Sequence, residues 1–110
     1  MTNRDVVEAY LRCFCGGDVD GMGPLLVTEL SVCGTLHSYS AAAEYLDDLR
    51  RDPLEPSVCR ILSVTESVDS VTLFYEYQKT DRTVRIAQLF ALESQRAKRI
   101  LSVFDGRGFD

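Results

Sequence analysis

The most telling pattern in the chain lies near its start and reads Val6-Val7-Glu8-Ala9-Tyr10-Leu11-Arg12-Cys13-Phe14-Cys15-Gly16-Gly17-Asp18-Val19-Asp20-Gly21-Met22. Apolar residues recur there at helical spacing until two glycines end the helix. Upstream, Thr2-Asn3-Arg4-Asp5 has the form of a capping box, so a helix start is expected at that point. Asp18 is placed to cap a short second helix that runs on to Leu25 and Leu26. The pattern predicts two consecutive N-terminal helices.

Downstream, the pattern changes from helices to strands. A short strand is expected over 30–34, followed by a third helix, Ala41–Asp52, capped by Ser38 or Ser40 and closed by Pro53 and Pro56. Its apolar stripe would consist of Ala43, Leu46 and Leu49. The remaining sequence alternates as long strands, expected at Val58–Val68, Val71–Thr80, Thr83–Leu92 and Lys98–Phe104. Helices followed by antiparallel strands predict one α+β domain over residues 1–110, with the helices on one sheet face.

The hairpin around Asp81-Arg82 allows a register to be predicted. A two-residue loop at this point pairs Tyr77 with Ile86, Tyr75 with Gln88 and Leu73 with Phe90. Both faces of the hairpin carry apolar side chains, so both are expected to be covered, one by the helices. The other face is expected to form a homodimer interface with a second copy through Phe74, Ala87, Leu89 and Ala91.

Composition excludes several classes of partner. The 110 residues carry a net charge of −5 without a long basic cluster, so binding to nucleic acid is not expected. No apolar run is long enough for a membrane span, and no export signal precedes the first helix, so a cytoplasmic location is expected.

The four cysteines do not form a metal-binding pattern. Cys13 and Cys15 are two residues apart on a helix, so their thiols point to different sides of it. The sequence has no C-x-x-C motif and only one histidine, and we expect all four cysteines to be reduced and mostly buried. The spacing of Asp18, Asp20 and Glu29 resembles part of a calcium loop, but Met22 and Pro24 argue against one. Neither a metal nor a cofactor is expected.

Taken together, three segments resemble the ketosteroid isomerase and SnoaL-like polyketide cyclase group of the nuclear transport factor 2-like superfamily. They are the helix pair Val6–Met22, the strands Phe74-Tyr75-Glu76-Tyr77-Gln78 through Gln88-Leu89-Phe90, and the C-terminal stretch 103–109. The resemblance implies a cone-shaped, cystatin-like roll of helices on a curved, mostly antiparallel sheet.

The resemblance also implies roles for individual residues. Ketosteroid isomerases use a tyrosine and a carboxylic acid to donate hydrogen bonds to the substrate's oxyanion, and an aspartate to move the proton. Tyr10 matches the tyrosine position and Gln88 matches the acid position. Gly34 matches the aspartate, and glycine cannot move a proton, so standard ketosteroid isomerase activity is not expected. His37, three residues later, is the possible substitute base.

Two functions remain open at this point. The first is a binding domain for a small hydrophobic molecule without established catalysis. The second is a cyclase, isomerase, dehydratase or hydrolase acting on a polyketide- or terpenoid-like carbonyl substrate. Tyr10 and His37 are its candidate catalytic residues, and Gln88 is a hydrogen-bond donor in either case. The expected pocket is an apolar cavity between the first helix, the third helix and the sheet, lined by Tyr10, Cys33, Leu73, Tyr75, Ile86, Gln88 and Phe90.

Overall fold

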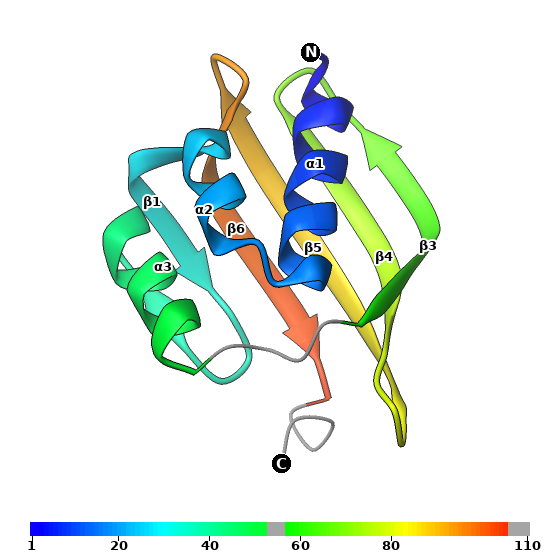
Figure 1. Cartoon of the computed structure of the whole chain (residues 1–110). Helices are drawn as coiled ribbons and strands as arrows, with labels where there is room; N and C mark the ends of the chain where they lie inside the picture. The colour runs from blue at the N-terminus through cyan, green and yellow to red at the C-terminus, as the bar shows by residue number, and fades with distance from the viewer. Residues whose placement is uncertain (53–56, 106–110) are drawn as a thin grey trace.

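The computed structural model describes residues 1–52 and 57–105 of the chain. Its elements in chain order are α1 (Asn3–Gly16), α2 (Val19–Met22), a 3₁₀ turn η1 (Gly23–Leu25), β1 (Leu26–Cys33), β2 (Ser38–Tyr39), α3 (Ala42–Arg51), β3 (Val58–Glu66), β4 (Ser70–Gln78), β5 (Thr83–Glu93) and β6 (Arg96–Phe104). The strands form one sheet in the order β2-β1-β6-β5-β4-β3, and the helices lie over one face of it (Figure 1). The expected α+β architecture is confirmed. Pro53, Pro56 and the stretch after Asp105 lie outside the described residues.

Helix α1 begins and ends at the signals that the sequence contains. The Thr2 hydroxyl accepts a hydrogen bond from the Asp5 backbone, and the Asp5 carboxylate accepts one from the Thr2 backbone, which completes the capping box. At the other end Gly17 adopts a left-handed conformation with φ of 73°, where a side chain would be strained. One face of α1 is buried against the sheet and consists of Val6, Val7, Tyr10, Leu11 and Cys15.

The middle of the chain differs from the sequence prediction. The second helix stops at Met22, and β1 already begins at Leu26, because Pro24 tightens the chain into a 3₁₀ turn first. The third helix has no side-chain cap from either Ser38 or Ser40, since its N-cap is Ala41. Its buried side chains are Tyr45 and Leu46, whereas Ala43, which we placed on the apolar stripe, is exposed.

The β4–β5 hairpin keeps the predicted faces but not the predicted register. Tyr75 lies opposite Ile86, and Leu73 lies opposite Gln88, which is two residues away from our pairing. The last pair joins Gln78 to Thr83, so the loop contains four residues rather than two. Because side chains alternate with a period of two, a shift of two residues leaves every side chain on its predicted face.

One pairing in the sheet is not between strands of a hairpin and was not predicted. Strand β1 runs parallel to β6, with Val32 opposite Ile100 and Leu26 opposite Ala97, while every other neighbouring pair is antiparallel. This parallel pairing places β1 and the short β2 beside the central strands. Helix α3 consequently lies over the β1 side of the sheet, while α1 packs against β3, β4 and β6 (Figure 1).

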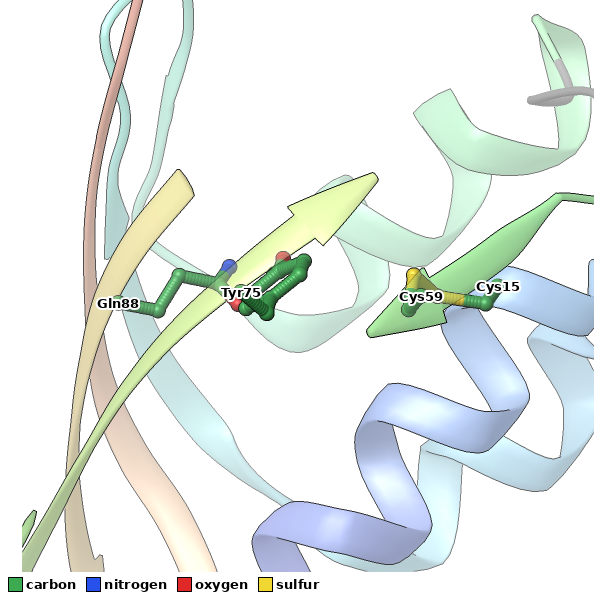
Figure 2. Close-up of a disulfide and its surroundings, with 4 residues drawn as sticks. All are labelled: Cys15, Cys59, Tyr75 and Gln88. Carbon is green, nitrogen blue, oxygen red and sulfur yellow. Dashed lines mark hydrogen bonds between the residues drawn. A yellow bond between two sulfur atoms is a disulfide. The ribbon is translucent and has the colours of Figure 1, made fainter. Parts of the chain in front are cut away.

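A disulfide joins Cys15, in the last turn of α1, to Cys59 on β3 (Figure 2). The expectation that these two cysteines are reduced is therefore wrong. The two Cα atoms are 6.2 Å apart, a separation that a disulfide can span, and the Ser57 amide donates a hydrogen bond to the Cys15 carbonyl beside it. Cys13 and Cys33 are free thiols, and Cys33 is exposed rather than buried.

Candidate functional site

A chain of polar side chains crosses the inner face of the sheet, which is the face covered by the helices. The Tyr75 hydroxyl on β4 donates a hydrogen bond of 2.8 Å to Oε1 of Gln88 on β5. Nε2 of Gln88 donates one of 2.9 Å to Oγ of Ser102, directly opposite on β6. Figure 2 shows the Gln88 amide extending toward the Tyr75 ring. Gln88 is only 6% exposed, and these two bonds offset the cost of burying its amide.

Two tyrosines from the helices lie against this row of polar side chains. The hydroxyls of Tyr10 on α1 and Tyr45 on α3 share a hydrogen bond, which ties the two helices together. Burial raises the pKa of Tyr10 and of Tyr45 above the ordinary tyrosine range, and for Tyr10 hydrogen bonds with Tyr45 and Gln88 oppose the rise. Burial likewise raises the pKa of Tyr75. All three phenols are therefore neutral and can donate a hydrogen bond near neutral pH.

A cavity of about 290 Å³ lies between α3, the β1–β2 connection and the inner face of the sheet. Most of its wall is apolar or aromatic and consists of Phe14, Val32, Gly34, Leu36, Tyr39, Tyr45, Leu49, Tyr75, Ile86 and Phe104. Its polar wall consists of Thr35, His37, Asp48, Asp52, Gln88 and Ser102. An apolar cavity with a few convergent polar groups has the composition of a site for a small molecule.

The acidic end of the cavity is formed by α3 and β2. The Tyr39 hydroxyl donates a hydrogen bond to the Asp48 carboxylate, and Arg51 approaches the other oxygen of Asp48 to 3.3 Å. Burial, followed by the hydrogen bond to Asp48 and its negative charge, raises the pKa of Tyr39 to about 12. Asp52, which follows α3, also lines the cavity.

The structure brings only part of the predicted pocket together. Tyr75, Ile86 and Gln88 line the cavity, and His37 lies exposed at its rim. The predicted pocket residues that do not line it are Tyr10, Leu73, Phe90 and Cys33.

Each exclusion has a packing reason. Tyr10 is 1% exposed, with its hydroxyl against Tyr45 and its ring edge-on to Phe90 at a centroid distance of 5.0 Å. Leu73 and Phe90 are fully buried in the same part of the core. Cys33 alternates with buried Val32 along β1 and is exposed, so it faces away from the cavity.

Gly34, which the family resemblance matched to the catalytic aspartate, lies on the cavity wall. Its amide donates a hydrogen bond of 2.9 Å to the His37 carbonyl, which closes a tight turn. A Cβ atom at this position would lie 3.1 Å from that same oxygen, closer than ordinary contact. A base-bearing side chain at this position would therefore require the turn to shift.

Sequence reasoning expected the third helix to cover the cavity but named none of its residues as lining. Tyr45, Asp48, Leu49 and Asp52 all line the cavity and recur at the i, i+3, i+4, i+7 spacing of one helical face. We instead placed the inward stripe on the apolar residues Ala43, Leu46 and Leu49.

Within the described residues, no three His, Cys, Asp or Glu side chains gather as metal ligands would. Over the same part of the chain, no helix has the length and apolar character needed to cross a membrane.

No protein-family model and no curated protein matches the sequence. Solved structures do match the fold. A nuclear transport factor 2-like protein of unknown function from Cytophaga hutchinsonii superposes with a TM-score of 0.84 at 17% identity, covering 99% of this chain and 95% of that one. An LEH-like epoxide hydrolase from M. tuberculosis gives 0.80 at 16% identity, with coverage of 96% and 84%.

A de novo designed protein with a curved β-sheet gives a TM-score of 0.82 at 14% identity, covering 97% of this chain and 90% of that one. The chain therefore has the nuclear transport factor 2-like fold, as its sequence led us to expect. An enzyme and a designed scaffold share this architecture, so the function has to be inferred from the cavity.

Proposed function

We propose that the chain binds a small, largely apolar molecule in the cavity beneath α3. The observation that carries this proposal is the position of Gln88, whose buried amide forms part of the cavity wall among aromatic and aliphatic side chains. A polar group in such surroundings fixes the orientation of a ligand, because an oxygen or nitrogen of the ligand finds a hydrogen-bonding partner there. Ser102 stands beside it as a second hydrogen-bonding group.

Substitution of Gln88 tests this proposal. Gln88→Leu is expected to weaken binding of an apolar fluorescent probe bearing one carbonyl by roughly tenfold, the equivalent of one net hydrogen bond of about 1.4 kcal/mol. The same substitution leaves the Tyr75 hydroxyl without its acceptor, so the fold should lose about 1–3 kcal/mol. The double variant Gln88→Leu/Tyr75→Phe removes both partners and should recover most of that stability without recovering binding.

Gln78→Leu is the matched control, because Gln78 lies at the end of β4 and does not line the cavity. It should bind the probe like the wild type. Equal binding by the wild type and the stable double variant would contradict the proposal.

Standard ketosteroid isomerase activity is not part of the proposal, because Gly34 provides no base. A positioned base contributes typically ~10²–10⁴-fold to such a rate. The purified protein should not isomerise a 3-oxo-Δ5 steroid above the buffer rate. Robust isomerisation that is lost in His37→Ala would show that His37 replaces the base.

A second candidate function is hydrolysis or isomerisation within the same cavity, and the Asp48 carboxylate favours it. A carboxylate on the wall of an apolar site can take a proton from water or from a substrate carbon, and Tyr39 holds this one in place. The epoxide hydrolase of similar fold makes epoxides a reasonable first substrate panel. Turnover that disappears in Asp48→Asn would favour this candidate over simple binding, whereas ligand binding without turnover would count against it.

We also propose a homodimer through the outer face of the sheet. Phe74, Ala87 and Val103 lie side by side across β4, β5 and β6, and Leu89 pairs with Leu101 in the adjacent row. Phe74 is 41% exposed and Val103 69% exposed, so the face presents apolar side chains to solvent. Ala91 extends the same face. An exposed apolar patch of this kind is typical of an interaction surface.

Sedimentation velocity tests the dimer. The wild type should sediment as a dimer at micromolar concentration, and Phe74→Glu should sediment as a folded monomer. Thr28→Glu, at an exposed position on β1, is the control and should remain dimeric. A wild-type monomer at high micromolar concentration would rule out this interface.

A further inference from the structure

We propose that the ligand of this cavity carries a positively charged amine, held between the aromatic rings and the carboxylates at the α3 end. This inference rests on the proposed binding function and narrows it to one class of molecule, an apolar body with a cationic head.

The charges of the cavity wall carry the first step. Two carboxylates, Asp48 and Asp52, line the cavity, and its described lining contains neither a lysine nor an arginine. Of the described lining residues only His37 can carry a positive charge, and it lies exposed at the rim. An anionic or neutral head would meet uncompensated negative charge at this end, whereas an ammonium group would neutralise it.

The rings beside these carboxylates carry the second step. Tyr39 and Tyr45 lie with their ring centroids 5.3 Å apart and tilted by 54°, and both line the cavity. The His37 ring is 6.4 Å from the Tyr39 ring. A cation close to aromatic faces is attracted by their negative electrostatic potential, and the attraction grows when the site is partly dry. An alkylated amine would use both the carboxylates and the rings.

The orientation of α3 also favours a positively charged group at this end of the cavity. Asp48 and Leu49 belong to the final turn of this ten-residue helix, and Asp52 caps its end. The C-terminal end of a helix carries partial negative charge on its unpaired carbonyl groups, which favours a cation nearby. The negative charge of Asp48 is already felt by its neighbour, because it contributes to the raised pKa of Tyr39.

The nearby arginines do not cancel this charge. Arg51 reaches Asp48 from the solvent side with 75% of its side chain exposed, and pairs exposed to this degree are weak. Arg50 is engaged with Asp20 and Asp47. Asp52 forms no ion pair with any of the residues that the structure describes. An ammonium group would therefore face at least one carboxylate without a competing partner.

The opposite end of the cavity requires the rest of the ligand to be apolar. Ile86, Phe104 and Tyr75 line the wall around Gln88 and Ser102, and among the described residues of these three strands no charged side chain lines the cavity. The ligand therefore combines an apolar body with an amine at one end. One hydrogen-bonding oxygen or nitrogen on the body would reach Gln88.

A matched set of three probes tests the inference on the intact wild-type protein. They are 2-naphthylmethylammonium, 2-naphthylmethanol and 2-naphthoate, which differ chiefly in the charge of the head. Isothermal titration calorimetry at neutral pH and low salt should give at least tenfold tighter binding of the ammonium than of the alcohol, with the carboxylate weakest. Binding of the alcohol as tight as that of the ammonium would overturn the amine inference but leave the binding function standing. Failure of all three probes to bind would overturn both.

Variants that replace a carboxylate by an amide show which residues favour the ammonium probe. Asp48→Asn and Asp52→Asn should each reduce ammonium binding several-fold while leaving binding of the alcohol within about twofold. Asp47→Asn is the control, because Asp47 lies on the same helix but does not line the cavity. If Asp47→Asn reduces ammonium binding as much as the other two, the preference reflects only the overall charge of the protein, and the inference fails.

Discussion

The space between the helices and the sheet is filled around Tyr10 in the middle of α1, whereas a cavity lies beneath α3. Around the middle of α1, Tyr10, Phe90 and Leu73 are at most 1% exposed, and none of them lines the cavity. Beneath α3, the same sheet face borders a cavity of about 290 Å³.

The two helices contribute different side chains. Helix α1 buries five residues against the sheet, whereas α3 buries only Tyr45 and Leu46. One turn further along, the inward face of α3 presents Asp48, and its end presents Asp52. Packing a carboxylate against apolar side chains costs free energy because the carboxylate loses its hydration. The C-terminal end of α3 therefore does not pack as closely against the sheet as α1 does. The cavity is a consequence of acidic residues on a face that is otherwise apolar.

The largest expected effect concerns the bond that anchors the filled half. Cys15→Ser/Cys59→Ser should destabilise the protein by roughly 4 kcal/mol in urea unfolding, because the bond closes a loop with a sequence separation of 44 residues. Near-ultraviolet circular dichroism should still show packed tyrosines in the folded variant. Loss of that signal under native conditions would mean that the disulfide, rather than side-chain packing, keeps the region around α1 ordered.

Cys33→Ser serves as the control for that pair and should change stability by only about 0.5 kcal/mol, since Cys33 is exposed. The unreduced native protein should contain two free thiols, Cys13 and Cys33. A count of four would show that the bond is absent.

A matched pair of leucine truncations compares the two halves directly. Leu73→Ala, in the filled half, should cost about 3 kcal/mol because it opens a new hole in a fully buried region. Leu49→Ala, on the cavity wall, should cost about 1 kcal/mol because the leucine already borders open space. Equal losses in chemical denaturation would indicate that the cavity collapses in solution.

High pH should distinguish the three fully buried tyrosines from Tyr39 at the cavity. Burial raises the pKa of Tyr10, Tyr45 and Tyr75, so above pH 10 the unfolded chain releases protons that the folded chain retains. Stability should therefore be complete below pH 10 and fall as the pH rises, by up to about 1.4 kcal/mol per pH unit for each of these tyrosines.

Tyr39, beside the cavity, should instead ionise near pH 12, provided that the protein is still folded there. Tyrosinate absorbance followed together with far-ultraviolet circular dichroism checks this behaviour. If the three buried tyrosines ionise near pH 10 while the helices persist, their hydroxyls are open to solvent, and for Tyr10 this would mean that the region around it is not closely packed.

The sequence predicted the features whose signals are local. The capping box at Thr2 and the glycines that end α1 act within a few residues, and both operate as expected. The alternating pattern of β4 and β5 placed each side chain on the correct face. The register was wrong by two residues because it depends on loop geometry, and a four-residue loop fits the same sequence as a two-residue one.

Features that depend on distant parts of the chain were not predictable from pattern. The pairing of β1 with β6 and the bond between Cys15 and Cys59 each join segments that are remote in sequence. The candidate site shows the same limit. Gln88 was identified through the family resemblance, whereas nothing in the local pattern separates Asp48 from the solvent-facing acids of the same helix.

The edges of the sheet restrict how copies of the protein can assemble. One edge strand, β2, has only two residues, and the other, β3, changes register between Ile61 and Ser63. Short or irregular edges offer a poor template for the strand of another molecule, so open-ended fibril growth by edge pairing is disfavoured. Association through the outer face would instead bring two identical surfaces together around a twofold axis and use up both, which limits the assembly to a closed pair.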